Sequence, residues 1–105
     1  MTTKHKPNSK FRLGNLVITE AVQDKLSSGV YVAGLKRHMN CDWGDLSPES
    51  QEDNFEAIEN GFDIFSAYGK RDRRFWIITN GDGSRTTILM PNDYLNATIS
   101  LSERT

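Results

Sequence analysis

The sequence lacks the features that mark several large classes of protein. It contains one cysteine, Cys41, among 105 residues, so no disulfide can form within the chain and we expect a reducing, cytoplasmic compartment. No apolar run approaches the ~20 residues that a membrane-spanning helix needs, and no apolar segment follows the basic N-terminus, so we expect neither a membrane span nor a signal peptide. The formal net charge of −1 predicts neither bulk binding of nucleic acid nor attraction to an anionic membrane.

The length fits one domain. A chain of 105 residues can bury a hydrophobic core without support from disulfides or metals. Residues 1–10 are polar and basic, which is typical of a solvated arm. We therefore expect a single domain over residues 11–95, between flexible tails at 1–10 and 96–105.

The strongest local pattern is a β-hairpin. Two β-rich runs, 73–79 and 85–90, flank the turn sequence Asn80-Gly81-Asp82-Gly83. The two glycines suit backbone positions with positive φ, so this cluster predicts a tight turn rather than a cation-binding loop.

The first run of the hairpin is apolar on both of its faces. Neighbouring side chains of a strand point to opposite sides, so Phe75 and Ile77 share one face while Trp76 and Ile78 share the other. This pattern predicts a central strand with helices on one side. The other side needs cover from a terminal segment, a target or a partner subunit, and a homodimer through Trp76 and Ile78 is one such arrangement.

The remaining patterns predict two more strands and three helices. Thr19 and Ser47 are expected to begin helices as N-caps, and Gly61 is expected to end the last helix. Along the second helix, Val32, Leu35 and Met39 recur at helical spacing and should face the core. The predicted elements are strands over 11–18 and 62–68 and helices over 20–26, 30–39 and 47–60.

These elements predict an α+β fold in a single domain. An antiparallel sheet of three to four strands, built as a β-meander of 62–68, 73–79 and 85–90 plus the N-terminal strand 11–18, should pack on three short helices. The expected core residues are Leu13, Val17, Leu35, Trp43, Phe55, Ile58, Phe62, Phe65, Phe75, Ile77, Ile88 and Leu89.

The helix over 47–60 is unusually acidic. No lysine or arginine occurs between Asp45 and Asp63, and like charges at helical spacing repel, as Glu52 and Glu56 would. The face is either a solvated, solubilising surface or a negative surface for a basic partner, with Trp43 as its apolar anchor. Its expected members are Asp45, Glu49, Glu52, Asp53, Glu56 and Glu59.

A basic patch precedes and follows the first hairpin strand. Next to Tyr68 and Trp76, such a patch could contact phosphates while the aromatic rings stack on bases. The same charges could instead protect the hairpin from aggregation or pair with the acidic helix. The patch contains Lys70, Arg71, Arg73, Arg74 and Arg85.

The segment from His38 to Leu46 carries several side chains that bind metals. His38, Cys41, Asp42 and Asp45 fit no zinc spacing, and a His38–Cys41 pair is not indicated by its separation in sequence alone. We therefore predict no metal, no cofactor and no catalytic residue, and leave the roles of His38 and Cys41 open. The segment should form a structured turn in which Trp43 packs inward and Gly44 makes the bend.

A set of short runs, spread over residues 11–94, carries a resemblance to one protein family. The most specific run is Asp42-Trp43-Gly44-Asp45-Leu46. The other residues that carry it are Phe11-Arg12-Leu13-Gly14, Thr19, Leu35, Arg37-His38, Asn54, Ser66-Ala67-Tyr68, Trp76-Ile77-Ile78-Thr79, Thr86-Thr87-Ile88-Leu89 and Pro91-Asn92-Asp93-Tyr94. Through these residues the chain resembles a family of small uncharacterised bacterial proteins, labelled "plasmid-related", that occur on plasmids and other mobile elements. Cys41 departs from the family, in which a small residue such as glycine is expected at this place.

The resemblance implies that the protein occurs on plasmids or other mobile elements, but it implies no activity. The functional expectation therefore rests on charge. We expect a non-enzymatic protein of a plasmid or phage that binds a host or element-encoded protein through the acidic helix and the loop before it. Its sharpest version is an inhibitor of a host defence system that handles nucleic acid. The alternative is a nucleic-acid-binding accessory protein that uses the basic patch. An enzyme ranks third, and a bound metal or a low pKa of the Cys41 thiol would reveal it.

Overall fold

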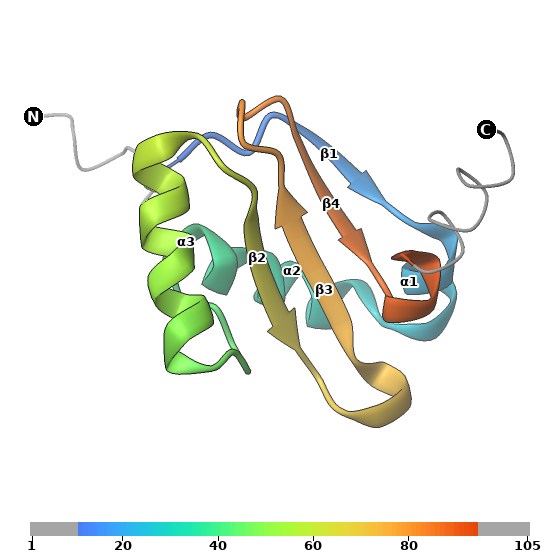
Figure 1. The fold of residues 1–105 in the computed structure, drawn as a ribbon. Helices are drawn as coiled ribbons and strands as arrows, with labels where there is room; N and C mark the ends of the chain where they lie inside the picture. Colours follow the sequence, from blue (N-terminus) through green and yellow to red (C-terminus); the bar gives the residue numbers. More distant parts are fainter. Residues whose placement is uncertain (1–10, 95–105) are drawn as a thin grey trace, which may run out of the picture.

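The computed structural model describes residues 11–94, and the two expected tails lie outside the described residues. One four-stranded sheet forms a single α+β domain with three α-helices, as predicted (Figure 1). The elements are β1 (Asn15–Ile18), α1 (Glu20–Lys25), α2 (Ser28–Met39), α3 (Pro48–Asn60), β2 (Ile64–Tyr68), a short 3-10 turn (Arg71–Arg73), β3 (Phe75–Thr79) and β4 (Arg85–Leu89).

The sheet is mixed rather than antiparallel throughout. Its order is β1-β4-β3-β2, and β2, β3 and β4 form the expected antiparallel meander. β1 pairs with β4 in parallel, which corrects the expectation for this strand. Both strands end beside Thr19, whose amide donates to Ile88 O at 3.1 Å and whose hydroxyl donates to Asp93 Oδ2 at 2.8 Å. This shared end fixes the direction of β1, because the chain must turn into α1 there.

Helices α1, α2 and α3 lie on one side of the sheet, and none of these three covers the opposite, open face. In Figure 1, α1 and α2 lie behind the sheet and α3 lies beside β2, while a short helical turn over residues 91–94 follows the end of β4. Thr19 and Ser47 cap their helices by accepting from Val22 N at 3.3 Å and from Ser50 N at 3.1 Å, as predicted. Gly61 ends α3 at φ 78°, also as predicted. None of the helices within residues 11–94 is long and apolar enough to cross a membrane.

The buried core has two apolar clusters. One lies under α1 and α2 and contains Val22, Leu26, Tyr68, Phe75, Ile77, Ile88 and Met90. The other lies between α3 and the sheet and contains Trp43, Ala57 and Ile64. Of the predicted core residues, Trp43, Phe75, Ile77, Ile88 and Leu89 are buried, and Leu13, Leu35, Ile58 and Phe65 are half-buried. The prediction was wrong for Val17, Phe55 and Phe62, which are exposed.

Helix α2 faces the sheet with a row of residues that only partly matches the predicted one. Leu35 and Met39 are half-buried, and Leu35 packs against the core as expected, but Val32 is exposed. Gly34 and His38 are the buried residues of this helix. A Cβ atom at Gly34 would lie 2.7 Å from the Phe75 ring. The absence of a side chain at Gly34 therefore brings α2 close to β3, and this approach sets which row turns inward.

The turn between β3 and β4 packs against the C-terminal end of α3. Gly83 has the expected positive φ of 72°. Gly81 does not have positive φ, contrary to the prediction, and is needed for close approach instead: a Cβ atom there would lie 2.1 Å from Gly61 O. Asp63 Oδ1 accepts from Gly81 N at 2.8 Å and closes this corner.

Candidate functional site

Helix α3 is fixed to β2 by a polar side chain. Asn54 is buried, donates from Nδ2 to Phe65 O at 2.7 Å and accepts at Oδ1 from Phe65 N at 3.0 Å. Both backbone groups on the outer edge of β2 at this point are therefore paired. Ala57, one turn further along, is also buried, and its small side chain lets the helix lie close to the strand.

This attachment turns the apolar stripe of α3 away from the core. Phe55, Ile58 and Phe62 follow helical spacing, but Phe55 is 47% exposed and Phe62 is 63% exposed, while Ile58 is half-buried. Phe55 and Ile58 line a shallow hollow of about 260 Å³ with Cys41 and Glu59. A large aromatic side chain in water is costly unless something covers it, so this stripe marks a candidate binding surface.

Acidic side chains border the stripe. Glu49, Glu52, Asp53, Glu56 and Glu59 are all exposed. Glu52 and Glu59 lie three residues before and four after Phe55, which places them beside its ring on the helix surface. Within residues 11–94 the ion pairs are Arg37–Asp42 and Arg74–Asp45, so these five acids have no ionic partner there. We call Phe55, Ile58, Phe62, Glu52, Glu56 and Glu59 the α3 surface.

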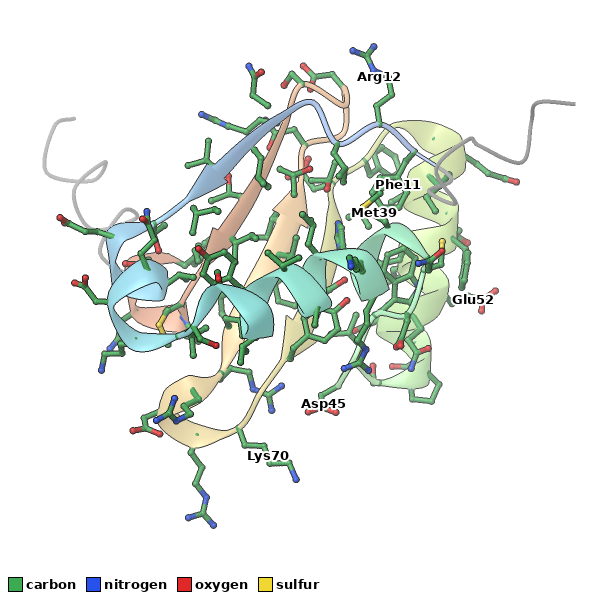
Figure 2. The ribbon with its side chains drawn as sticks, turned by 180° about the vertical axis from the view of Figure 1, so that it is seen from behind. Phe11, Arg12, Met39, Asp45, Glu52 and Lys70 are labelled. Atoms are coloured by element: carbon green, nitrogen blue, oxygen red, sulfur yellow. The ribbon has the colours of Figure 1, made fainter. Side chains whose placement is uncertain are left out.

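Two residues expected on the acidic face lie elsewhere. Asp45 accepts from Arg74 Nη1 at 3.1 Å, and Figure 2 shows it near the connection that carries Lys70, whereas Glu52 projects from the outer side of α3. Trp43 is only 1% exposed, so it cannot act as the apolar anchor in this structure. Its ring lies 5.7 Å from both the His38 and the Phe55 rings, measured between centroids.

The structure brings together most of the expected basic patch. Lys70, Arg71, Arg73 and Arg74 lie in or beside the connection between β2 and β3. Arg85 begins β4 beside the turn at the opposite end of β3, so it does not join them.

Lys25 joins the basic connection although sequence reasoning missed it. Arg73 Nη1 donates to Lys25 O at 3.5 Å, and Lys25, Arg71 and Arg74 line a hollow of about 260 Å³. The aromatic residues expected beside this patch are engaged elsewhere, because Tyr68 is buried and the Trp76 ring packs against the Phe65 and Tyr94 rings.

His38 is the centre of a buried chain of hydrogen bonds. Thr86 Oγ1 donates to Leu13 O at 2.7 Å, so Thr79 must donate to Thr86 across their 2.8 Å contact. Thr79 then accepts from His38 Nε2–H at 2.9 Å, and His38 Nδ1 accepts from the Ser66 hydroxyl. The carbonyl at the end of the chain thus requires a proton on His38 Nε2, and burial, which lowers the pKa of the ring, keeps His38 neutral so that Nδ1 is the acceptor.

This chain of hydrogen bonds excludes His38 from pairing with Cys41 and from binding a metal. Burial lowers the pKa of His38 to about 4. Both ring nitrogens are engaged, so neither can act as a base toward Cys41 or bind a metal while these bonds persist. No group of three metal-binding side chains occurs in the part of the chain that the structure describes. Cys41 itself has φ 63°, a conformation that favours glycine, the type of residue expected at this position.

Comparison with known proteins gives no relative from which to transfer a function. No protein-family model, no curated protein and no solved structure matches this chain. The functional argument therefore rests on the geometry of the α3 surface.

Proposed function

We propose that this chain is a non-enzymatic protein that binds a basic partner protein through the α3 surface. One observation carries the proposal: α3 is attached by Asn54 and Ala57, so that Phe55 and Phe62 face solvent beside acids that have no ionic partner among residues 11–94. A face that served solubility alone would need the charges but not the aromatic rings.

The aromatic and acidic residues have separate tasks in this proposal. A buried aromatic anchor typically contributes ~2 kcal/mol or more to a protein interface, so Phe55 and Phe62 supply most of the affinity. Rim charges raise the association rate and select partners of opposite charge. The partner should therefore offer an apolar pocket with lysines or arginines around it.

A protein that handles nucleic acid fits this chemistry. Its binding channel is lined by basic side chains, and a protein inhibitor with an acidic surface can occupy that channel. Together with the resemblance to plasmid-related proteins, this favours a plasmid or phage protein that inhibits a nucleic-acid-handling defence protein of its bacterial host.

Affinity capture from host lysate tests the binding surface. The native chain should retain a basic protein, and a Glu52→Lys/Glu56→Lys/Glu59→Lys variant that folds by circular dichroism should lose it. Glu20→Lys/Asp24→Lys, which reverses exposed acids of α1, is the matched control and should retain it. Equal capture by all three proteins, or capture by none, would contradict the proposal.

The basic connection supports a second candidate function. Lys25, Arg71 and Arg74 line the hollow together with one acid, Asp72, and this excess of cations favours phosphate contact at this end of the molecule. If the native chain retains nucleic acid rather than protein, and Arg71→Ala/Arg73→Ala releases it in a salt-dependent way, the accessory-protein alternative replaces the first. Absence of DNA or RNA binding at low salt would rule the alternative out.

A further inference from the structure

The open face of the sheet is apolar and hollowed. Trp76 and Ile78 of β3 lie on it, and the Phe65 and Trp76 rings pack at 5.1 Å between centroids. Tyr94 continues the aromatic row, with its ring 5.9 Å from that of Trp76. A hollow of about 510 Å³ remains beside this row. Its lining residues are Asp63, Phe65, Ile78, Asn80, Arg85, Thr87, Leu89 and Tyr94.

The hollow carries one acid and one base in a symmetric arrangement. Asp63 directly precedes β2 and Arg85 begins β4, so the two lie at the same end of the sheet on either side of β3. Neighbouring strands are ~4.8 Å apart, which places each charge about one strand spacing from the axis of β3. Within residues 11–94 neither side chain belongs to an ion pair.

We propose that this face binds the same face of a second copy of the chain, with a two-fold axis along β3. Rotation about that axis exchanges the β2 side with the β4 side. Asp63 of each copy then lies opposite Arg85 of the other, and Ile78 of one copy meets Ile78 of its partner. Such an isologous contact is self-complementary in both shape and charge, as a closed dimer requires.

The size of the face makes the dimer weak. Strands of five residues span ~17 Å, and four strands span ~14 Å, so the flat projection is far smaller than the ~800 Å² per partner of a standard interface. Aromatic side chains that project from the sheet must enlarge the contact area beyond this projection. The two reciprocal ion pairs must add to the stability of the dimer. We therefore expect dimers at high micromolar concentration and monomers at low concentration.

Sedimentation velocity of the full chain tests the proposal between about 1 µM and about 1 mM, a range that brackets a weak association. The native chain should change from monomer to dimer, and Ile78→Arg should remain monomeric. Asp63→Arg and Arg85→Asp should each weaken the dimer by at least about tenfold because like charges then face each other. The double swap should restore it, and Glu52→Lys, on α3, should leave it unchanged.

The charge swap keeps the test decisive even if Ile78→Arg fails to fold. A native chain that is monomeric at every concentration would overturn the proposal and would leave the face to a different occupant. A dimer that ignores the single swaps, or one that the double swap does not restore, would also overturn it. The outcome is independent of the proposed function, since the α3 surface is not part of this face.

Discussion

Replacing His38 with alanine is expected to lower the free energy of unfolding by about 3–5 kcal/mol, the range for losing a large buried side chain together with its hydrogen bonds. His38 is 0% exposed and packs against the Phe11 and Trp43 rings. Its removal leaves a cavity, deprives the Ser66 hydroxyl of its acceptor and deprives Thr79 of a donor. Urea denaturation followed by circular dichroism measures the loss.

A matched set of variants separates packing from hydrogen bonding at this site. His38→Phe keeps most of the volume but leaves the Ser66 hydroxyl without its acceptor and Thr79 without the donor from His38, and it should cost about 2 kcal/mol. Adding Ser66→Ala and Thr79→Val removes those hydroxyls and should recover part of that loss. If the triple variant is less stable than the sum of its single changes, the chain of hydrogen bonds does not account for the stability.

The lowered pKa of His38 also predicts how the stability of the protein depends on pH. Its pKa is about 4 in the folded protein and 6.5 in an unconstrained chain, so between these values the unfolded state binds more protons. The stabilisation from neutral His38 is fully present above pH 6.5 and is lost as pH falls toward 4. The full loss amounts to about 3 kcal/mol. The stability of the native chain relative to the triple variant should fall by about this amount as pH drops across this range, and parallel pH profiles would contradict the assignment.

The second large effect is expected at the α3 surface. Phe55→Ser/Phe62→Ser should weaken binding of the captured partner by about 100-fold or more, because two aromatic anchors contribute ~2 kcal/mol each. The same variant should lose less than about 1.5 kcal/mol of stability, since both rings are substantially exposed before binding. Titration calorimetry with the purified partner and urea denaturation measure the two quantities.

A control variant shows whether exposed apolar side chains matter in general. Leu16→Ser/Val30→Ser replaces residues that are 45% and 48% exposed but lie on β1 and α2. This variant should bind the partner normally. Equal weakening by both variants would mean that the anchors lie outside the α3 surface.

Local patterns predicted most of the fold. The helix caps at Thr19 and Ser47, the stop at Gly61 and the hairpin between β3 and β4 depend on short-range hydrogen bonds and on conformations that few residues adopt, so the sequence encodes them directly. The inward packing of Trp43 and the bend at Gly44 were predicted for the same reason and are confirmed.

Long-range packing decided the features that the sequence did not reveal. The apolar stripe at Phe55 and Phe62 pointed to the core, but the pair of hydrogen bonds from Asn54 to Phe65 gives α3 another inward side. The parallel pairing of β1 depends on where α1 meets β4. The chain of hydrogen bonds through His38 joins residues of α2, β2, β3 and β4, and no local pattern in the sequence pointed to it.

A plasmid-establishment assay tests the central claim most directly. Bacterial hosts with and without a nucleic-acid-handling defence system would express the native chain, the Glu52→Lys/Glu56→Lys/Glu59→Lys variant or the Glu20→Lys/Asp24→Lys control, and would then receive a plasmid that the defence restricts. We expect the native chain and the control to restore establishment in at least one defended host, and the α3 variant to fail there. Restoration by the α3 variant, or no restoration by the native chain in any defended host, would contradict the account.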